Sequence, residues 1–197
     1  MASSQTDICN MALLKITRTT ITSIDQDIPE AIYCKQYYDH IRDSLLRSHF
    51  WNFAKKRQSL QRLATTPAFG YTYQYDLPAD YIRAVKLYNT TAPYKIEGKK
   101  LLTDDNSVSL IYISKVTDPT QFDALFVEVF STLLAAELSR PVTGSEDYRE
   151  RLLKEADKKM TEAKRRDGQE DTPDDIMTET LTNSRSNNTF TASWDLG

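Results

Sequence analysis

The sequence has few of the residues that carry disulfide or metal chemistry. It holds only two cysteines, Cys9 and Cys34, and two histidines in 197 residues. Both cysteines fall at apolar positions of expected helices, which favours buried free thiols over a disulfide. His40 and His49 stand nine residues apart, with no cluster of Cys, Asp or Glu at ligand spacing around them. We therefore expect no metal and no cofactor.

Long apolar runs and glycine-rich stretches are also lacking. The apolar runs are too short and too interrupted to cross a bilayer, and the polar start Ala2-Ser3-Ser4-Gln5 lacks the regions of a signal peptide. Five glycines and seven prolines leave little room for long linkers. We expect a chain made and kept in a cytoplasm, without a membrane partner, with one well-buried domain plus a tail.

A strong excess of positive charge is absent as well. The net charge is −3, and the stretch from Gly168 to Gly197 carries six acids and one base, a net of −5. Residues 1–167 are therefore left with about +2. A sequence-reading nucleic-acid binder normally shows a basic stripe, which this near-neutral body does not supply.

Apolar periodicity predicts four helices. Ser4 can cap the first, Asp27-Ile28-Pro29-Glu30 supplies a capping box for the second, and Arg140-Pro141 ends the third. The third is apolar on most sides, so it should be the central helix, whereas the fourth has one narrow apolar stripe. The expected helices span residues 4–17, 28–49, 120–140 and 145–167, and the stripe is Tyr148, Leu152, Ala156, Met160 and Ala163.

The period changes between residues 51 and 114. Aromatic residues alternate from Tyr71 to Leu77, a hairpin is expected at Gly98, and residues 108–113 are β-branched and apolar. The fold class predicted is α+β, mainly α: a bundle of about four helices with an inserted small antiparallel sheet. Residues 1–167 form the domain and residues 168–197 an extended acidic C-terminal arm.

The end of this arm carries large apolar side chains. Phe190, Trp194 and Leu196 follow a polar stretch that is low in core-forming residues. Such side chains suit a segment that orders on a partner surface. The alternative, which we favour less, is that Phe190 and Trp194 pack back on their own domain.

Several short sequence motifs, here called words, resemble those of the head-to-tail adaptor family of short-tailed bacteriophages, often called tail tubular protein A. Each word is weak alone, but their order is specific, and the resemblance extends as helix pattern to about Arg166. Thr17 departs from the family, where a glycine often closes the first helix. The words are Ile8-Cys9-Asn10, Ala12-Leu13, Ile21-Thr22-Ser23-Ile24, Pro29-Glu30-Ala31, Tyr38-Asp39, Arg42-Asp43-Ser44-Leu45-Leu46, Trp51-Asn52-Phe53-Ala54 and Leu77-Pro78 with Asp80 and Arg83.

The resemblance implies a structural virion protein without catalytic residues, assembled in the host cytoplasm. Such proteins form a ring of twelve between the portal protein and the tail nozzle protein. The ring encloses the channel through which genomic DNA leaves, without sequence-specific binding. In the family the C-terminal arm commonly extends to the portal, which implies that Phe190, Trp194 and Leu196 are partner-binding anchors.

Two other classes of function remain open. Some adaptors of short-tailed phages have been described as cell-wall (peptidoglycan) hydrolases, a reaction that needs two carboxylates. The acids in the most apolar sequence surroundings are Glu30, Glu128 and Glu137. A single-strand nucleic-acid-binding module is the other class, because basic residues stand among aromatics. The residues concerned are Lys55, Lys56, Arg57 and Arg62 near Trp51, Phe53 and Tyr71.

Overall fold

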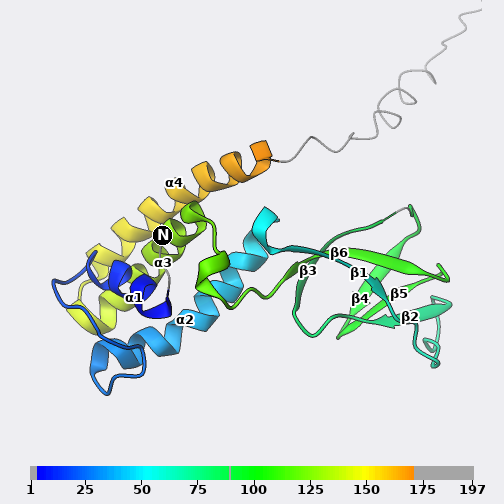
Figure 1. The fold of residues 1–197 in the computed structure, drawn as a ribbon, viewed down its shortest axis with the longest axis horizontal. Coiled ribbons are helices and arrows are strands. Elements are labelled where there is room, and N and C mark those ends of the chain that lie inside the picture. Colours follow the sequence, from blue (N-terminus) through cyan, green and yellow to red (C-terminus); the bar gives the residue numbers. More distant parts are fainter. Residues whose placement is uncertain (1–3, 89, 171–197) are drawn as a thin grey trace, which may run out of the picture.

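The computed structural model describes residues 4–88 and 90–170. The molecule is elongated, with a helical unit formed by the four α-helices at one end and a β unit formed by the six strands at the other (Figure 1). This confirms the predicted α+β class with a sheet insertion between helices. The elements are α1 (Gln5–Leu13), α2 (Pro29–Ser48), η1 (Asn52–Ala54), β1 (Lys55–Leu60), β2 (Tyr73–Asp76), β3 (Tyr81–Leu87), β4 (Tyr94–Glu97), β5 (Lys100–Thr103), β6 (Val108–Ser114), η2 (Pro119–Gln121), α3 (Ala124–Thr143) and α4 (Glu146–Glu170).

Helix α1 begins as predicted but ends early. The Ser4 hydroxyl accepts a hydrogen bond from the Asp7 amide at 3.1 Å, which caps the helix. The helix stops at Leu13 rather than at Thr17, and turn hydrogen bonds carry the chain onward, including one from the Thr17 amide to the Leu13 carbonyl at 2.7 Å. The β-branched residues Ile16 and Thr17, which follow this end, do not favour continuation of the helix.

Helix α2 begins without the predicted capping box. Its N-cap residue is Ile28, which has no side-chain acceptor, and Pro29 occupies the first turn as expected. The prediction of a cap from Asp27 and Glu30 was therefore wrong. Proline fixes φ at a helical value and has no N–H to satisfy, so the helix can start there without a polar cap.

Helix α3 is displaced at both ends from the prediction. Pro119 opens a separate 3-10 turn, and the helix starts at Ala124, where the Asp123 carboxylate accepts from the amides of Leu125 and Phe126. It then continues through Pro141 to Thr143. Proline was expected to end it, but Pro141 lies in the last turn, where one missing hydrogen bond matters little. Gly144, with φ of 70°, provides the actual stop.

Helix α4 packs along α3 and runs three residues past the predicted end at Asp167, to Glu170. Leu152, Ala156 and Ala163 of the predicted stripe are buried, which confirms the packed edge. Tyr148 is an exception, since it remains 39% exposed.

The β unit contains two sheets, where the sequence predicted one. Their strand orders are β1-β6-β3 and β2-β5-β4, and every pairing is antiparallel. The hairpin between β4 and β5 turns at Gly98, whose φ is 61°, so that part of the prediction is confirmed. Sequence alternation locates strands but does not say which strands pair, and the division into two sheets follows from pairing.

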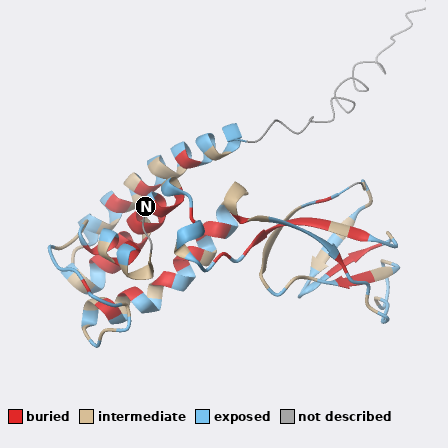
Figure 2. Ribbon diagram, in the orientation of Figure 1, coloured by how far each residue is buried: buried red, intermediate tan, exposed pale blue. Residues whose placement is uncertain are grey.

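The buried residues, red in Figure 2, form two clusters, of which one is centred in the helical unit and includes Ile113 of β6, and the other lies in the β unit. Trp51, Phe126 and Phe130 lie in the helical cluster, whereas Tyr75 and Tyr112 lie in the β cluster. Cys9 and Cys34 are buried in the helical cluster as free thiols, which confirms the prediction. Among the described helices, none is long and apolar enough to cross a membrane.

Candidate functional site

The most distinctive sequence word, Trp51-Asn52-Phe53-Ala54, lies where the helical unit joins the β unit. Trp51 is completely buried, and its indole Nε1 donates to the Leu45 carbonyl at 2.9 Å. The rings of Phe126 and Phe53 contact it, with centroid distances of 5.2 and 6.1 Å. Because its ring and its N–H are both used internally, Trp51 is a core residue rather than a binding residue.

Asn52, His49 and Asp167 form a polar clasp at the same corner. The Asp167 carboxylate accepts from the Asn52 backbone amide at 3.0 Å and lies 2.9 Å from His49 Nε2. The Asn52 side-chain amide donates to the Asp167 carbonyl at 2.7 Å. These bonds join residues more than a hundred positions apart in the chain, so the clasp fixes the last turns of α4 against the end of α2.

A second junction uses Arg47 and Arg83. The Arg47 guanidinium donates to the Ile82 carbonyl at 2.7 Å, and the Arg83 guanidinium donates to the Arg47 carbonyl at 3.1 Å. The Arg83 guanidinium also lies over the Phe50 ring, 4.3 Å from its centroid. The end of α2 and strand β3 are therefore held by reciprocal contacts.

Arg42, from another of the quoted words, is a buried charge. Its side chain bonds to Asp39 at 2.8 Å and to Asp43 at 2.7 Å, and Lys115 from the end of β6 reaches Asp43 at 2.8 Å. A buried guanidinium needs such partners to offset its desolvation. The network thus links α2 to the chain that leaves the β unit.

Asp80 connects β1, β3 and β6. Its carboxylate accepts from Lys56 Nζ at 2.6 Å and from the Tyr112 hydroxyl at 2.9 Å. Burial acts to raise the pKa of Asp80, but the hydrogen bonds from Lys56 and Tyr112 outweigh it and hold this pKa below its usual value. In turn, burial and the hydrogen bond to Asp80 raise the pKa of Tyr112 to about 12.

We predict that Asp80→Asn lowers the free energy of unfolding by about 1 kcal/mol at pH 7, because a partly exposed charged hydrogen-bonded pair is lost. A lowered pKa favours the charged carboxylate in the folded state, so its contribution is present above the unfolded pKa of about 3.9 and is lost as pH falls through the folded pKa. Urea unfolding at pH 7 and near pH 2.5 measures this. Asp76→Asn, at an exposed position at the end of β2, is the matched control. A difference between Asp80→Asn and the native chain that stays constant over this range contradicts the prediction.

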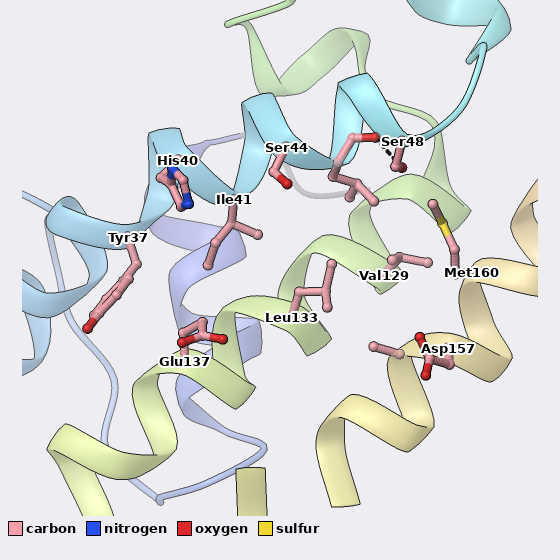
Figure 3. A pocket seen from close by; sticks show the side chains of 12 residues that line it. Tyr37, His40, Ile41, Ser44, Ser48, Val129, Leu133, Glu137, Asp157 and Met160 are labelled. Atoms are coloured by element: carbon pink, nitrogen blue, oxygen red, sulfur yellow. Dashed lines mark hydrogen bonds between the residues drawn. The ribbon is translucent and has the colours of Figure 1, made fainter. Parts of the chain in front are cut away.

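A concavity with a volume of about 460 Å³ lies between α2, α3 and α4. Its apolar lining comes from all three helices, with Ile41 from α2, Leu133 from α3 and Met160 from α4 directed into it (Figure 3). We call it the three-helix groove. Its full lining is Tyr37, His40, Ile41, Ser44, Leu45, Ser48, Val129, Leu133, Glu137, Ala156, Asp157 and Met160.

Polar side chains stand around this apolar lining. His40 and Ser44 come from α2, Glu137 from α3 and Asp157 from α4 (Figure 3). Glu137 pairs with Arg149 at 3.2 Å. Apolar lining with a few polar groups around it is typical of a surface that receives a side chain or a segment of a partner.

The far end of the β unit carries an exposed aromatic residue. Phe69, in the segment between β1 and β2, is 88% exposed, and Gly70 beside it has φ of 88°. This segment lies at the end of the molecule opposite the helical unit (Figure 1). A large aromatic side chain that is almost fully exposed is available for contact with another molecule. We call this segment the Phe69 tip.

Charge is divided between the two units. Residues 55–115, which hold the strands, contain ten Lys and Arg residues against five Asp and Glu residues, a net of +5. Residues 1–54 and 116–170 contain 14 bases and 18 acids, a net of −4. The near-neutral body expected from the sequence is therefore the sum of a basic β unit and an acidic helical unit.

The predicted partner-binding residues Phe190, Trp194 and Leu196 lie outside the described residues. The candidate hydrolase acids are not brought together as a pair. Glu128 and Glu137 are nine positions apart on α3, which separates them by about 14 Å along the helix axis, farther than the two carboxylates of a glycosidase. Each pairs with a base of α4, Lys159 or Arg149, while Glu30 lies in the first turn of α2.

The candidate nucleic-acid set is also divided. Trp51 is buried and cannot stack on a base, and Phe53 packs on Phe122 and Phe126. The Arg62 guanidinium lies over the Tyr73 ring at 5.0 Å. Lys56 pairs with Asp80. Residues 4–88 and 90–170 contain no group of three or more His, Cys, Asp or Glu side chains that could hold a metal ion.

Comparison of the chain with protein-family models and with curated proteins gives no match. The candidate surfaces, which are the three-helix groove and the Phe69 tip, therefore rest on the structure alone. Sequence reasoning missed the three-helix groove, whose lining comes from three helices, and the Phe69 tip. The one available signal was Pro67-Ala68-Phe69-Gly70, an aromatic residue between turn formers.

Proposed function

We propose that this protein is a head-to-tail adaptor of a short-tailed bacteriophage virion. The observation that carries the proposal is that one elongated chain consists of two units that carry different candidate contact features. The three-helix groove and the start of the C-terminal arm belong to the helical unit, and the Phe69 tip belongs to the β unit. A molecule with this arrangement can hold one partner at each end.

The places that the words of the adaptor resemblance occupy in the structure support the proposal. Their most distinctive members, Trp51, Asn52, Arg42, Asp80 and Arg83, are used at junctions between helices and strands. Such positions determine a particular assembly of helical and β units rather than a reaction. Because the resembling residues lie at these junctions, the resemblance indicates a similar arrangement of helical and β units rather than a shared reaction.

In the proposed assembly, twelve copies form a ring. The helical unit and residues 171–197 face the portal protein, and the Phe69 tip faces the tail nozzle protein. The excess of positive charge on the β unit favours an acidic surface on the nozzle. Genomic DNA passes through the ring without sequence-specific contacts, and the virion neck is the site of the protein.

The experiment measures binding of the purified chain to the portal ring and to the nozzle of the same virion by analytical ultracentrifugation. A truncation after Glu170, which keeps all of α4, should weaken portal binding at least tenfold and leave nozzle binding unchanged. Phe69→Ser should weaken nozzle binding at least tenfold and leave portal binding unchanged. Failure of the full-length chain to bind either partner at any salt concentration contradicts the adaptor proposal.

The alternative is a tail-associated peptidoglycan hydrolase. The described carboxyl groups whose pKa departs from its ordinary value, Asp80, Asp118 and Glu155, are all lowered, whereas a glycosidase acid needs a raised pKa. This alternative therefore has less support. Cleavage of glycan strands by the purified chain, abolished by Glu137→Gln or Glu128→Gln, would replace the adaptor proposal with the hydrolase.

A further inference from the structure

We infer that the three-helix groove of the free protein is occupied by the aromatic end of the same chain, Phe190 and Trp194. The docking itself does not depend on the adaptor function. The occupant comes from residues 171–197, which follow α4 directly. One consequence of this docking rests on the proposed function: the groove and a portal would compete for Phe190 and Trp194.

The groove has the size and chemistry for aromatic side chains. A concavity of about 460 Å³ falls within the usual range of about 300–1,000 Å³ for pockets that bury organic ligands. Its lining includes Ile41, Leu45, Val129, Leu133 and Met160, which are all apolar. Methionine also adapts its shape and makes favourable contacts with aromatic rings.

The length of the chain allows the return. Met160 lines the groove and Glu170 ends α4, so ten residues separate them, or about 15 Å of helix. From Glu170 to Phe190 there are twenty residues, which can span up to about 66 Å. The segment therefore reaches back without being stretched, and the entropic cost of closing a loop rises only slowly with its length.

Local charge on α4 favours the same path, within a helical unit whose net charge is −4. Lys158, Lys164 and Arg165 on α4 form no ion pair with another residue of the described chain. Lys164 lies one turn beyond Met160 on the same face of the helix. The segment that follows α4 is acidic in its first part, where it carries Asp171, Asp174, Asp175 and Glu179. A chain that turns back at Glu170 brings these acids toward the unpaired bases of α4, and the aromatic residues then follow toward the groove.

The chain has two tryptophans, so quenching of tryptophan fluorescence by acrylamide can measure the docking. Trp51 is completely buried, so acrylamide quenches it weakly whatever the C-terminal segment does. The signal of Trp194 is obtained as the difference between the native chain and Trp194→Phe. We expect Trp194 of the native chain to emit at shorter wavelength and to have a quenching constant at least threefold lower than that of exposed tryptophan.

A groove-blocking variant tests the location. Ser44 lines the groove, is exposed and makes no hydrogen bond with described residues, so Ser44→Arg places a long side chain there without disturbing the core. Gln36→Arg introduces the same side chain at another exposed position of α2, outside the groove, and serves as the matched control. Ser44→Arg should raise the quenching constant of Trp194 at least threefold, while Gln36→Arg leaves it at the native value. The quenching of Trp51, measured in the Trp194→Phe background, checks that both variants are folded.

Three results overturn the inference. If Trp194 of the native chain is quenched as readily as exposed tryptophan, the groove is empty. Protection that survives Ser44→Arg assigns the docking to another surface. Protection that rises with protein concentration identifies the occupant as a second copy. None of these measurements includes a portal ring, so their outcome is separate from that of the adaptor experiment.

Discussion

Replacing Trp51 by alanine should lower the free energy of unfolding by about 3–5 kcal/mol, the range for removal of a large buried aromatic side chain. Trp51 is 0% exposed and lies among rings from two parts of the chain, with Phe126 at 5.2 Å and His49 at 4.9 Å between centroids. The substitution leaves a cavity and frees the Leu45 carbonyl, which accepts from Trp51 Nε1. Urea unfolding followed by far-ultraviolet circular dichroism measures the loss, because Trp51 is itself a main source of fluorescence.

Two variants separate packing from the hydrogen bond. Trp51→Phe keeps an aromatic ring but cannot donate to Leu45, so we expect a loss of about 1–3 kcal/mol from the smaller ring and the unpaired carbonyl. Phe69→Ala removes an exposed aromatic and should change the free energy of unfolding by less than about 0.5 kcal/mol. A loss below 1 kcal/mol for Trp51→Ala contradicts the assignment of Trp51 to the core junction.

Replacing Asp167 by alanine should lower the free energy of unfolding by about 2–3 kcal/mol. The variant loses the acceptor for the Asn52 amide at 3.0 Å and the contact with His49 at 2.9 Å. The carboxylate is largely buried, and the groups left unpaired at this corner bear the cost of desolvation. Chemical denaturation measures the loss, and hydrogen exchange of the Asn52 amide should become faster than in the native chain.

The controls for Asp167 use its own geometry and its own helix. Asp167→Asn keeps an oxygen that can accept from the Asn52 amide, so it should retain part of the stability that alanine loses. Glu162→Ala removes an exposed carboxylate of α4 that pairs with Arg166 at 3.1 Å, and should cost no more than about 0.5 kcal/mol. Equal losses for Asp167→Ala and Glu162→Ala would show that the clasp does not stabilise this corner.

The clasp also matters for the proposed assembly. Asp167 stands three residues before the end of α4, so the clasp fixes the end of the helix from which the chain continues. A docking segment that starts from a fixed point searches a smaller volume than one that starts from a frayed helix end. Asp167→Ala should therefore weaken whatever contact these residues make, even though it does not touch the contact itself.

Local patterns predicted the local structure well. Apolar periodicity located the four helices, and Gly98 located a hairpin turn. Helix ends were less predictable. Pro141 was expected to stop α3, but its position in the last turn allowed the helix to continue to Thr143. A capping box was expected at Asp27 and Glu30, but Pro29 was sufficient to start α2. In both cases several local signals competed, and local patterns do not show which signal is stronger.

The sequence by itself determined which segments form helices and strands and that the two thiols are buried. These follow from periodicity, turn residues and composition, which act over a few neighbouring positions. Only the tertiary structure decided the pairing of strands into two sheets, the clasp between Asn52 and Asp167, and the groove between α2, α3 and α4. Each of these joins residues that are tens of positions apart or more, and such contacts depend on how whole elements pack together rather than on local preference.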